Sequence, residues 1–290
     1  MLLLGGFTER EVSLLSGREV KDALVRLGHE VFELDITTED LCLISIEKAD
    51  MIFNCLHGGV GENGVVQSIC NMKNIPYTGS NVLASALAMN KVLAKKIFSS
   101  EGINTPVGKV SNIQNILVKE PFPRPYVIKP IDGGSSLGVN IINKGTDLNL
   151  IECSNSDMLI EQYISGREIA VAVIEDKVLG MIEINYPDKF YDYDAKYKSD
   201  KNNYIIPNNL KISLKNKIEQ YAISAHKSLG CRGITRSDFI ISEDAGDEAT
   251  LLEINTLPGL TKNSLVPKIA KNAGLTFDAL IAMIIKEALS

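Results

Sequence analysis

The 290-residue sequence has no apolar run long enough to cross a membrane. Its longest runs, Ile169 to Ile174 and Leu280 to Ile285, fall far short of the ~20 residues that a transmembrane helix needs. The opening residues, MLLLGGFTEREVS, hold too few apolar residues for the hydrophobic part of a signal peptide. We therefore expect a soluble protein of the cytoplasm.

Cysteine pairs and an excess of positive charge are also missing. The five cysteines are scattered without a CxxC pair, which predicts free thiols in a reducing compartment and argues against a zinc site. The 30 Lys and Arg residues are outnumbered by 36 Asp and Glu residues, which gives a net charge of −6. This balance argues against a protein that binds nucleic acid or an anionic membrane, because such proteins carry a basic face.

What is present is an ordinary globular composition, with 45% hydrophobic and 23% charged residues. The first third alternates strands and helices, which indicates an α/β fold with a parallel sheet. From residue 126 onward, short strands joined by tight turns indicate an α+β arrangement with antiparallel hairpins. The predicted elements are strands 2–4, 30–34, 49–56, 76–78, 126–129, 139–142, 158–162, 169–174, 177–184, 237–242 and 249–255, and helices 11–27, 65–72, 84–100, 214–229 and 276–288.

A glycine-rich segment, Gly59 to Gly64, matches the GxGxxG pattern of dinucleotide-binding loops. The acidic residue that such a loop needs ~20 positions later is absent, because Thr78 to Met89 contains no Asp or Glu. We interpret the segment as a turn that lets the backbone approach a small ligand near His57. An NAD-dependent oxidoreductase is a distant alternative.

A second glycine-rich segment, Lys129 to Gly138, joins two predicted strands and contains three glycines and two serines. The chain has no GxxxxGK[ST] phosphate-binding loop. A strand–loop–strand unit of this composition can still fold its backbone N–H groups over phosphate oxygens, with Lys129 neutralising their charge. A plain glycine hairpin is the alternative.

The predicted hairpin near the C-terminus carries three oxygen ligands. Symmetric pairing about its turn places Asp238 opposite Glu253 and Ile240 opposite Leu251. Asn255 lies two residues beyond Glu253 and therefore shares its face. Two opposed carboxylates repel each other unless a cation lies between them, and oxygen ligands of this kind suit Mg²⁺. A solvated acidic rim is the alternative, against which the apolar Ile240/Leu251 pair argues.

Three residues close to this hairpin could contact a substrate. Arg236 either neutralises the acids or stabilises negative charge on a phosphoryl or acyl oxygen. The turn after the hairpin exposes the N–H of Gly259, and Ser264 either holds a substrate carboxylate or caps a helix.

An aromatic segment lies between residues 186 and 204, where six of the chain's eight Phe and nine Tyr residues gather. This concentration indicates a loop that closes over a site and excludes water. Lys196 and Tyr197 are its candidate polar residues.

In this order, the motifs resemble the ATP-grasp superfamily and, within it, the family of D-alanine–D-alanine ligases. The resemblance covers essentially the whole chain, and family members usually have Asp where Asn90 stands. The blocks that carry it are Gly5-Gly6, Glu9 to Leu14, Leu56-His57-Gly58, Gly61 to Gly64, Tyr77 to Ser80, Met89-Asn90-Lys91, Val127 to Pro130, Gly134 to Gly138, Tyr191 to Tyr197, Arg236-Ser237-Asp238, Glu253 to Thr256 and Pro258-Gly259.

The resemblance implies an ATP-grasp fold in three parts. These are an N-terminal pre-ATP-grasp domain with a parallel sheet (1–84), a central subdomain (85–166) and a C-terminal catalytic domain with the 186–204 loop (167–290). ATP is expected between the last two, and the protein is expected to be a homodimer.

The resemblance also implies the residues that hold ATP and metal. Two Mg²⁺ ions, for which Mn²⁺ is an alternative, are expected on Asp238, Glu253 and Asn255. The phosphates of ATP are expected to contact Lys91, Lys129 and Lys196, and Ser136 is a further expected ATP contact. The adenine is expected to contact Glu161, Gln162 and Ile164, and the ribose is expected to contact Glu168.

For the amino-acid substrates, the resemblance implies that Glu11 binds the amine of the first D-alanine and is linked through Ser135 to Tyr197. His57 is expected close to the same molecule. Two further pairs are implied: an oxyanion site made by Arg236 and the N–H of Gly259, and a carboxylate site for the second substrate made by Ser264 and Leu265.

The implied reaction has two steps and serves the synthesis of peptidoglycan precursors. The carboxylate of one D-alanine attacks the γ-phosphate of ATP, and the amine of a second D-alanine then attacks the acyl phosphate. A ligase that forms D-alanyl-D-lactate is the nearest alternative, and Tyr197 argues against it because lactate-using members have Phe there. Another ATP-grasp carboxylate–amine ligase and a non-catalytic nucleotide sensor are further alternatives.

Overall fold

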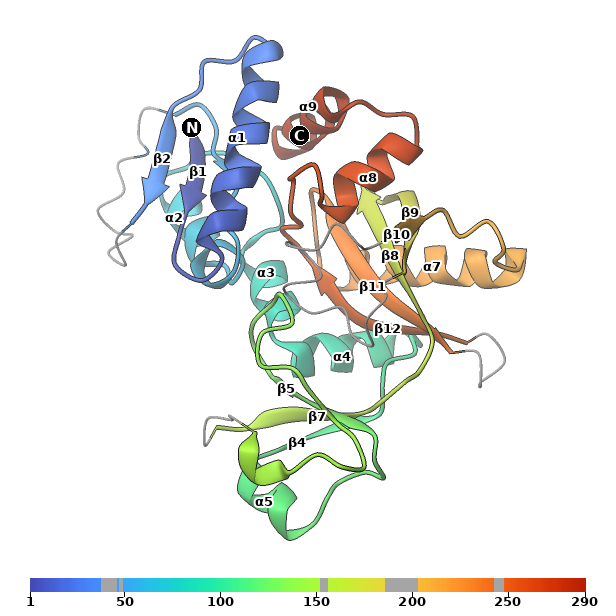
Figure 1. Cartoon of the computed structure of the whole chain (residues 1–290). Helices are drawn as coiled ribbons and strands as arrows, with labels where there is room; N and C mark the ends of the chain where they lie inside the picture. The colour runs from blue at the N-terminus through green and yellow to red at the C-terminus, as the bar shows by residue number, and fades with distance from the viewer. Residues whose placement is uncertain (38–45, 47–48, 152–155, 186–202, 243–247) are drawn as a thin grey trace.

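The computed structural model describes residues 1–37, 46, 49–151, 156–185, 203–242 and 248–290. Within these residues the strands form three sheets, which Figure 1 shows as an N-terminal, a central and a C-terminal group of strands. No helix in the described ranges is long and apolar enough to cross a membrane. The three sheets meet around α3 and α4, where the site described below is found.

The N-terminal sheet is parallel, as the alternation of strands and helices predicted. Its strands are, in spatial order, β2 (Glu33–Ile36), β1 (Leu2–Gly5) and β3 (Phe53–Asn54). All of β1 is buried, as is typical of a parallel strand covered on both faces. Helix α1 (Arg10–Arg26) packs closely on it, because a Cβ at Gly17 would lie only 3.0 Å from the Leu4 side chain.

Three predicted strands of this region are wrong in extent. The strand predicted at 30–34 is β2, which begins only at Glu33 and runs to Ile36. The segment 49–56 pairs as a strand only in β3, and the segment 76–78 is reduced to a parallel bridge between Tyr77 and Ile52. The short helices η2 (Gly59–Gly61) and α2 (Val65–Met72) lie between them, and α2 has the predicted bounds.

The predicted helix 84–100 is also wrong, because it is two helices. These are α3 (Val82–Met89) and α4 (Lys91–Ser100), separated by Asn90, whose backbone is extended with ψ 97°. The Asn90 side chain accepts a hydrogen bond of 3.0 Å from the Leu93 N–H and so caps α4. Aspartate and asparagine cap helices in the same way, so this position keeps the cap that the usual family residue would provide.

The central sheet is antiparallel throughout, which confirms the predicted hairpins. A buried cluster that includes Tyr126, Ile128, Ile142 and Ile160 holds it together. Its elements are, in chain order, β4 (Gly108–Ser111), α5 (Ile113–Val118), β5 (Tyr126–Pro130), β6 (Asn140–Ile142), η3 (Leu148–Leu150) and β7 (Met158–Gln162).

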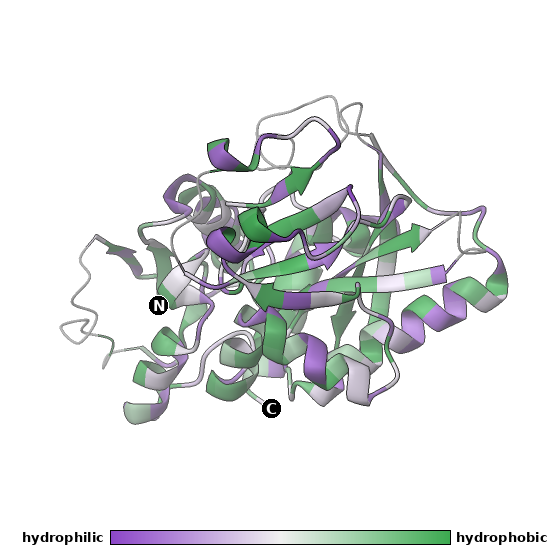
Figure 2. Ribbon diagram, turned by 90° about the horizontal axis from the view of Figure 1, so that it is seen from below, coloured by the Kyte–Doolittle hydropathy of each residue, from purple (hydrophilic) through white to green (hydrophobic). Residues whose placement is uncertain are grey.

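The C-terminal sheet is antiparallel, and helices cover both of its faces. Figure 2 shows hydrophobic residues along most of its strands and mixed hydropathy along the surrounding helices. Its spatial order is β10-β9-β8-β11-β12, and its elements are β8 (Arg167–Ile174), β9 (Lys177–Asn185), β10 (Asn203–Ile205), α7 (Ile212–Ser228), β11 (Thr235–Ser242), β12 (Glu248–Asn255), α8 (Leu265–Asn272) and α9 (Phe277–Ala288).

Strand β8 divides the interior into two cores. Ala170, Ala172 and Ile174 face a cluster built with β1, α1, α8 and α9. Ile169, Val171 and Val173 face a second cluster built with α3, α4, α7, β11 and β12. The N-terminal sheet is therefore joined to the C-terminal sheet by a continuous apolar core.

The predicted elements did not include the strands β4 and β10, the helices α5 and α8, or the short helices η2 and η3. Helix α8, which the sequence offered only as the helix that Ser264 caps if it does not hold a carboxylate, contains Pro267. That proline lies in the first turn of the helix, where its missing N–H has no helical partner to lose.

The Asn90 cap leads to a stability prediction. Loss of a helix cap costs about 1 kcal/mol of stability. In a chain of this size, such a loss lowers the thermal midpoint by about 2–4 °C, which is the shift that we expect for Asn90→Ala. Asn90→Asp keeps an oxygen acceptor for Leu93 and should stay within about 1 °C of the parent. Thermal unfolding followed by circular dichroism tests this, and equal midpoints for all three proteins would show that the cap contributes nothing.

Candidate active site

Two adjoining pockets lie where the three sheets meet. The first pocket is lined mainly by polar groups. The second pocket lies between the central and C-terminal sheets. Lys91, Gly133, Gly134 and Glu253 line both, so a molecule in the second pocket can present one end to the first.

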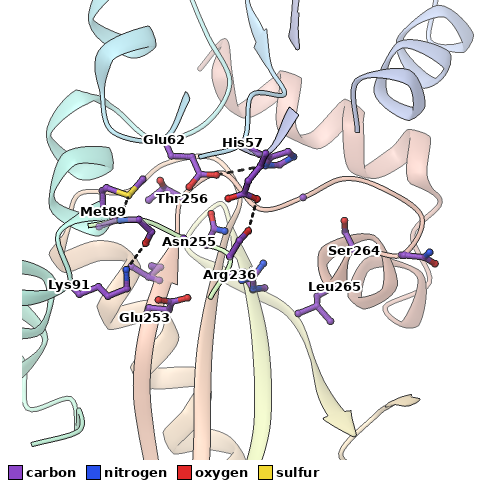
Figure 3. Close-up of a pocket in the computed structure, with 18 residues that line it drawn as sticks. His57, Glu62, Met89, Lys91, Arg236, Glu253, Asn255, Thr256, Ser264 and Leu265 are labelled. Carbon is purple, nitrogen blue, oxygen red and sulfur yellow. Dashed lines mark hydrogen bonds and ion pairs between the residues drawn. The ribbon is translucent and has the colours of Figure 1, made fainter. Parts of the chain in front are cut away.

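The segment between β5 and β6 forms the wall between the two pockets. Ser135 and Ser136 both have left-handed backbone, with φ of 52° and 59°, a conformation uncommon for residues with side chains. The Lys91 ammonium donates to the Gly133 carbonyl at 2.5 Å, and the Gly133 N–H points at the Met89 sulfur at 3.3 Å (Figure 3). These contacts fix the glycine-rich loop onto the start of α4.

The structure corrects one predicted residue, Glu11. Glu11 lies on the exposed side of α1 and lines neither pocket, because the helix begins at Arg10 and turns its buried face through Val12 and Ser13. Glu9, just before the helix, is buried and lines the first pocket. Its carboxylate accepts a hydrogen bond of 2.5 Å from the Ser135 hydroxyl, the partner that was predicted for Glu11.

His57 lies in the first pocket and is held from two sides. Its Nε2 lies 3.1 Å from the Ser16 hydroxyl, and its Nδ1 lies 3.7 Å from a carboxylate oxygen of Glu62 (Figure 3). Glu62, which sequence reasoning missed, also accepts the Gly58 N–H at 2.9 Å.

The glycines around Glu62 serve a turn. A Cβ at Gly61 would lie 2.5 Å from that of Leu56, and Gly64 has φ 100° beside the Val82 carbonyl. This turn holds Glu62 in the first pocket, beside His57, which precedes the glycine-rich segment. The arrangement supports the interpretation of Gly59 to Gly64 as a turn over its interpretation as a dinucleotide-binding loop.

Buried lysines and a buried glutamate meet at the second pocket. The Lys129 ammonium lies 2.6 Å from Glu161, and Lys95 contacts the other oxygen of the same carboxylate. Burial lowers the pKa of Lys91 and of Lys95, and nearby carboxylates oppose that shift. Sequence reasoning selected Lys91 and missed Lys95, although the spacing of four residues puts both on one face of α4.

The other predicted nucleotide residues line the second pocket. They share it with the apolar side chains of Val139, Ile141, Ile240 and Leu252, which form a surface suited to a flat ring. The predicted residues that line it are Lys91, Lys129, Ser136, Glu161, Gln162, Ile164 and Glu168.

The hairpin of β11 and β12 confirms one register prediction and contradicts another. Asp238 is opposite Glu253, as predicted. A β-bulge follows at once, so that Ile240 pairs with Thr250 and not with Leu251. The bulge leaves Leu252 without a strand partner, and Leu252 lines the second pocket next to Glu253.

Arg236 neutralises one acid of this hairpin. Its guanidinium donates two hydrogen bonds of 2.8 Å to the two oxygens of Asp238 and also lines the first pocket. Asn255 lines the first pocket as well, and its side-chain oxygen accepts the Leu257 N–H at 2.8 Å. Over the described part of the chain, no cluster of three or more His, Cys, Asp or Glu side chains is arranged to hold a metal.

Gly259, Ser264 and Leu265 line the first pocket together. A Cβ at Gly259 would lie 2.7 Å from the Ser264 hydroxyl, so glycine leaves that side of the pocket open. Ser264 stands at the N-cap of α8 but does not cap it, since its oxygen accepts the Thr261 N–H at 3.1 Å. The partial positive charge of the α8 N-terminus is therefore directed at a pocket that suits a carboxylate.

Four residues that the sequence analysis considered lie outside the described ranges. Lys196 and Tyr197 fall within residues 186–202, Cys42 within 38–45 and Cys153 within 152–155. The three described cysteines are free thiols, and burial raises the pKa of Cys70 to about 11 and that of Cys231 to about 12. Free thiols were predicted for all five cysteines, and the prediction is confirmed for the three that the structure describes.

Comparisons with known proteins agree over the whole chain. The family model described as D-ala D-ala ligase C-terminus matches residues 106–286, and the model described as D-ala D-ala ligase N-terminus matches residues 41–80. A D-alanine–D-alanine ligase of Acidiphilium cryptum is 40% identical over 99% of this chain and 97% of its own length. One from a Chelativorans species is 43% identical over 99% and 96%.

A solved structure shows the same fold. The D-alanine–D-alanine ligase from Bacillus anthracis complexed with ATP superimposes with a TM-score of 0.84 at 31% identity, over 99% of this chain and 95% of that one. The ATP-grasp fold predicted from the sequence is thereby confirmed. Since a family model matches more than half of the chain and full-length relatives share at least 40% of its residues, the chain belongs to the D-alanine–D-alanine ligase family.

Proposed function

We propose that this protein joins two molecules of D-alanine into D-alanyl-D-alanine for peptidoglycan precursor synthesis, with conversion of ATP to ADP and phosphate. The observation that carries the proposal is the pair of adjoining pockets that share Lys91, Gly133, Gly134 and Glu253. This sharing brings the phosphate end of a nucleotide to a small polar pocket that suits an amino acid. Family membership supports the same conclusion.

ATP occupies the second pocket in this proposal. The adenine lies against the apolar side chains and is held by Glu161, Gln162 and Ile164, while Glu168 holds the ribose. Lys91, Lys129 and the Ser135–Ser136 backbone receive the phosphates. Lys196 is assigned the same role on the resemblance alone.

Mg²⁺ is assigned to Asp238, Glu253 and Asn255. Two carboxylates and an amide are the hard oxygen donors that this ion prefers. Asp238 is opposite Glu253 and both line the second pocket, while Glu253 and Asn255 line the first, which supports a metal between the two pockets. When bound, Mg²⁺ supplies neutralising charge to the phosphates.

The first D-alanine binds in the first pocket. The Glu9 carboxylate, oriented by Ser135, receives its ammonium group, and Tyr197 is proposed to complete that link. Its carboxylate oxygen then attacks the γ-phosphate, forming an acyl phosphate and releasing ADP. His57, held by Ser16 and Glu62, borders the same molecule.

The second D-alanine enters beside α8. Ser264, the backbone at Leu265 and the helix N-terminus hold its carboxylate, so that its amine attacks the acyl carbon. Arg236 and the Gly259 N–H stabilise the oxyanion, and phosphate leaves as the amine loses its proton. Catalysis of this kind consists mostly of positioning and charge neutralisation.

The assembly and location of the protein complete the proposal. The resemblance supports a homodimer that works in the cytoplasm, and Mn²⁺ as an alternative to Mg²⁺.

Product analysis tests the function directly. With Mg²⁺ and ATP, D-alanine alone should give ADP, phosphate and D-alanyl-D-alanine, detected by coupled phosphate release and mass spectrometry. L-Alanine should give no product. A depsipeptide from D-lactate plus D-alanine as the main product would instead favour a different acceptor, and no phosphate release with D-alanine would contradict the proposal.

The exchange of Glu11 for Glu9 is tested by a matched pair of variants. Glu9→Gln should lower kcat/KM by about 10–100-fold, because it removes a charged hydrogen bond from the substrate ammonium. Glu11→Gln, on the exposed side of α1, should stay within about twofold of the parent. Steady-state kinetics with varied D-alanine distinguish the two, and a larger loss in Glu11→Gln would restore the original assignment.

The metal assignment predicts a change in magnesium dependence. Glu253→Gln should raise the Mg²⁺ concentration for half-maximal activity at least about 10-fold, because one anionic ligand is lost. Glu248→Gln, an exposed substitution on the same strand, serves as the control and should leave that concentration unchanged. Identical Mg²⁺ titrations for the two variants would rule out Glu253 as a ligand.

A further inference from the structure

Helix α4 directs two lysines toward the nucleotide pocket, and only one of them has a role so far. Lys91 and Lys95 are four residues apart and therefore share a helix face. Lys91 lines both pockets, whereas Lys95 lines neither. The Lys95 side chain is nevertheless only 11% exposed.

Lys95 is held in place by two acceptors. Its ammonium contacts the Oε1 atom of Glu161 and donates to the Pro106 carbonyl at 2.6 Å. The carboxylate raises the pKa of this ammonium against the stronger lowering by burial. A cation that is this deeply buried and bound to two oxygens is unsuited to reach a ligand.

Glu161 is shared between two cations. Its Oε2 atom lies 2.6 Å from the Lys129 ammonium, while Oε1 faces Lys95. The three side chains are between 3% and 11% exposed, so the charges interact with little screening by water. The cluster holds two positive charges and one negative charge, which leaves an excess of positive charge beside the pocket.

The backbone makes room for this arrangement. Gly108 of β4 pairs directly with Glu161 of β7. A Cβ at Gly108 would lie 3.0 Å from Cγ of Glu161 and 3.1 Å from the Lys95 ammonium. The place that a side chain would take opposite Glu161 is thus occupied by the Lys95 head group.

The two cations differ in what they can reach. Lys129 extends from β5 and lines the second pocket, where the phosphates are proposed to bind. If Lys129 turns to a phosphate, the buried Glu161 loses one of its two counter-ions. An unpaired buried carboxylate is costly, so that movement requires a second cation that stays behind.

We propose that Lys95 is a positioning residue, the resident counter-ion of Glu161 that allows Lys129 to turn from this carboxylate to the phosphates of the nucleotide. The inference rests on the proposed function in placing ATP in the second pocket. It adds a division of labour between two lysines that contact the same carboxylate.

Binding measurements test this without any turnover. The probes are Mg²⁺-ATP, inorganic tripolyphosphate and adenosine, each titrated by calorimetry or by displacement of a fluorescent ATP analogue. Lys95→Met leaves Lys129 as the main counter-ion of Glu161, so ATP and tripolyphosphate should each bind about 10-fold more weakly. Adenosine, which has no phosphate, should stay within about twofold, and Lys95→Arg should restore most of the affinity for ATP.

Two further variants separate this mechanism from simple damage. Lys96→Met, at the exposed neighbouring position of the same helix, should bind all three probes as the parent does. Adding Glu161→Gln to Lys95→Met removes the carboxylate that retains Lys129. Binding of tripolyphosphate, which has no adenine for Glu161 to hold, should therefore recover to within about twofold of the parent. Thermal unfolding checks that each variant folds.

Specific results would overturn the proposal. Equal losses for adenosine and tripolyphosphate in Lys95→Met, or no recovery of tripolyphosphate binding in the double variant, would show that Lys95 does not act by releasing Lys129. Failure of the unaltered protein to ligate D-alanine while it still binds ATP would contradict the proposed function and leave this test intact.

Discussion

The arrangement around the two pockets depends on one constraint: every charge buried there needs an ion pair or a hydrogen bond. Glu9, Lys91, Lys129, Glu161 and Asp238 are all less than 9% exposed. Each has a partner from another part of the chain or a neighbouring position, and an unpaired buried charge would cost several kcal/mol. The pairs therefore connect the N-terminal segment, the glycine-rich loop and the two antiparallel sheets around a common centre.

The apolar cores make this concentration of charge affordable. Strand β8 contributes alternate residues to two cores, one shared with α1 and β1 and the other with α4 and β12. The elements that carry Glu9, Lys91 and Glu253 are thus held by packing on either side of a single strand. The charged groups make local contacts around the pockets, and the apolar cores add packing between the N-terminal and C-terminal sheets.

Regular, local patterns made much of the fold and site predictable. The parallel N-terminal sheet, the antiparallel hairpins and the Asp238–Glu253 pair all follow from alternation and turn symmetry. The bulge after Asp238 could not be predicted in this way, because symmetric pairing about a turn assumes a ladder without an extra residue. Glu9 and Glu11 differ only in where α1 begins, and a sequence pattern places a helix end no better than within a residue or two.

Lys95 escaped prediction for a related reason. Its partner Glu161 is 66 residues away, and the space it fills exists only because Gly108 lies opposite that glutamate. Such a contact depends on three strands and a helix meeting in register. No local pattern around Lys95 distinguishes it from the exposed Lys96 beside it, apart from its spacing to Lys91.

The break at Asn90 connects the core to the charged cluster. Ala88 of α3 and Ala94 and Phe98 of α4 pack into the same core, so both helices are anchored on the C-terminal sheet. A continuous helix would fix the faces of both segments at once. The capped break at Asn90 lets α4 take its own rotation, in which Lys91 reaches the Gly133 carbonyl and Lys95, one turn later, reaches Glu161. The first turns of α4 after this break therefore carry both cations, Lys91 beside the glycine-rich loop and Lys95 beside Glu161.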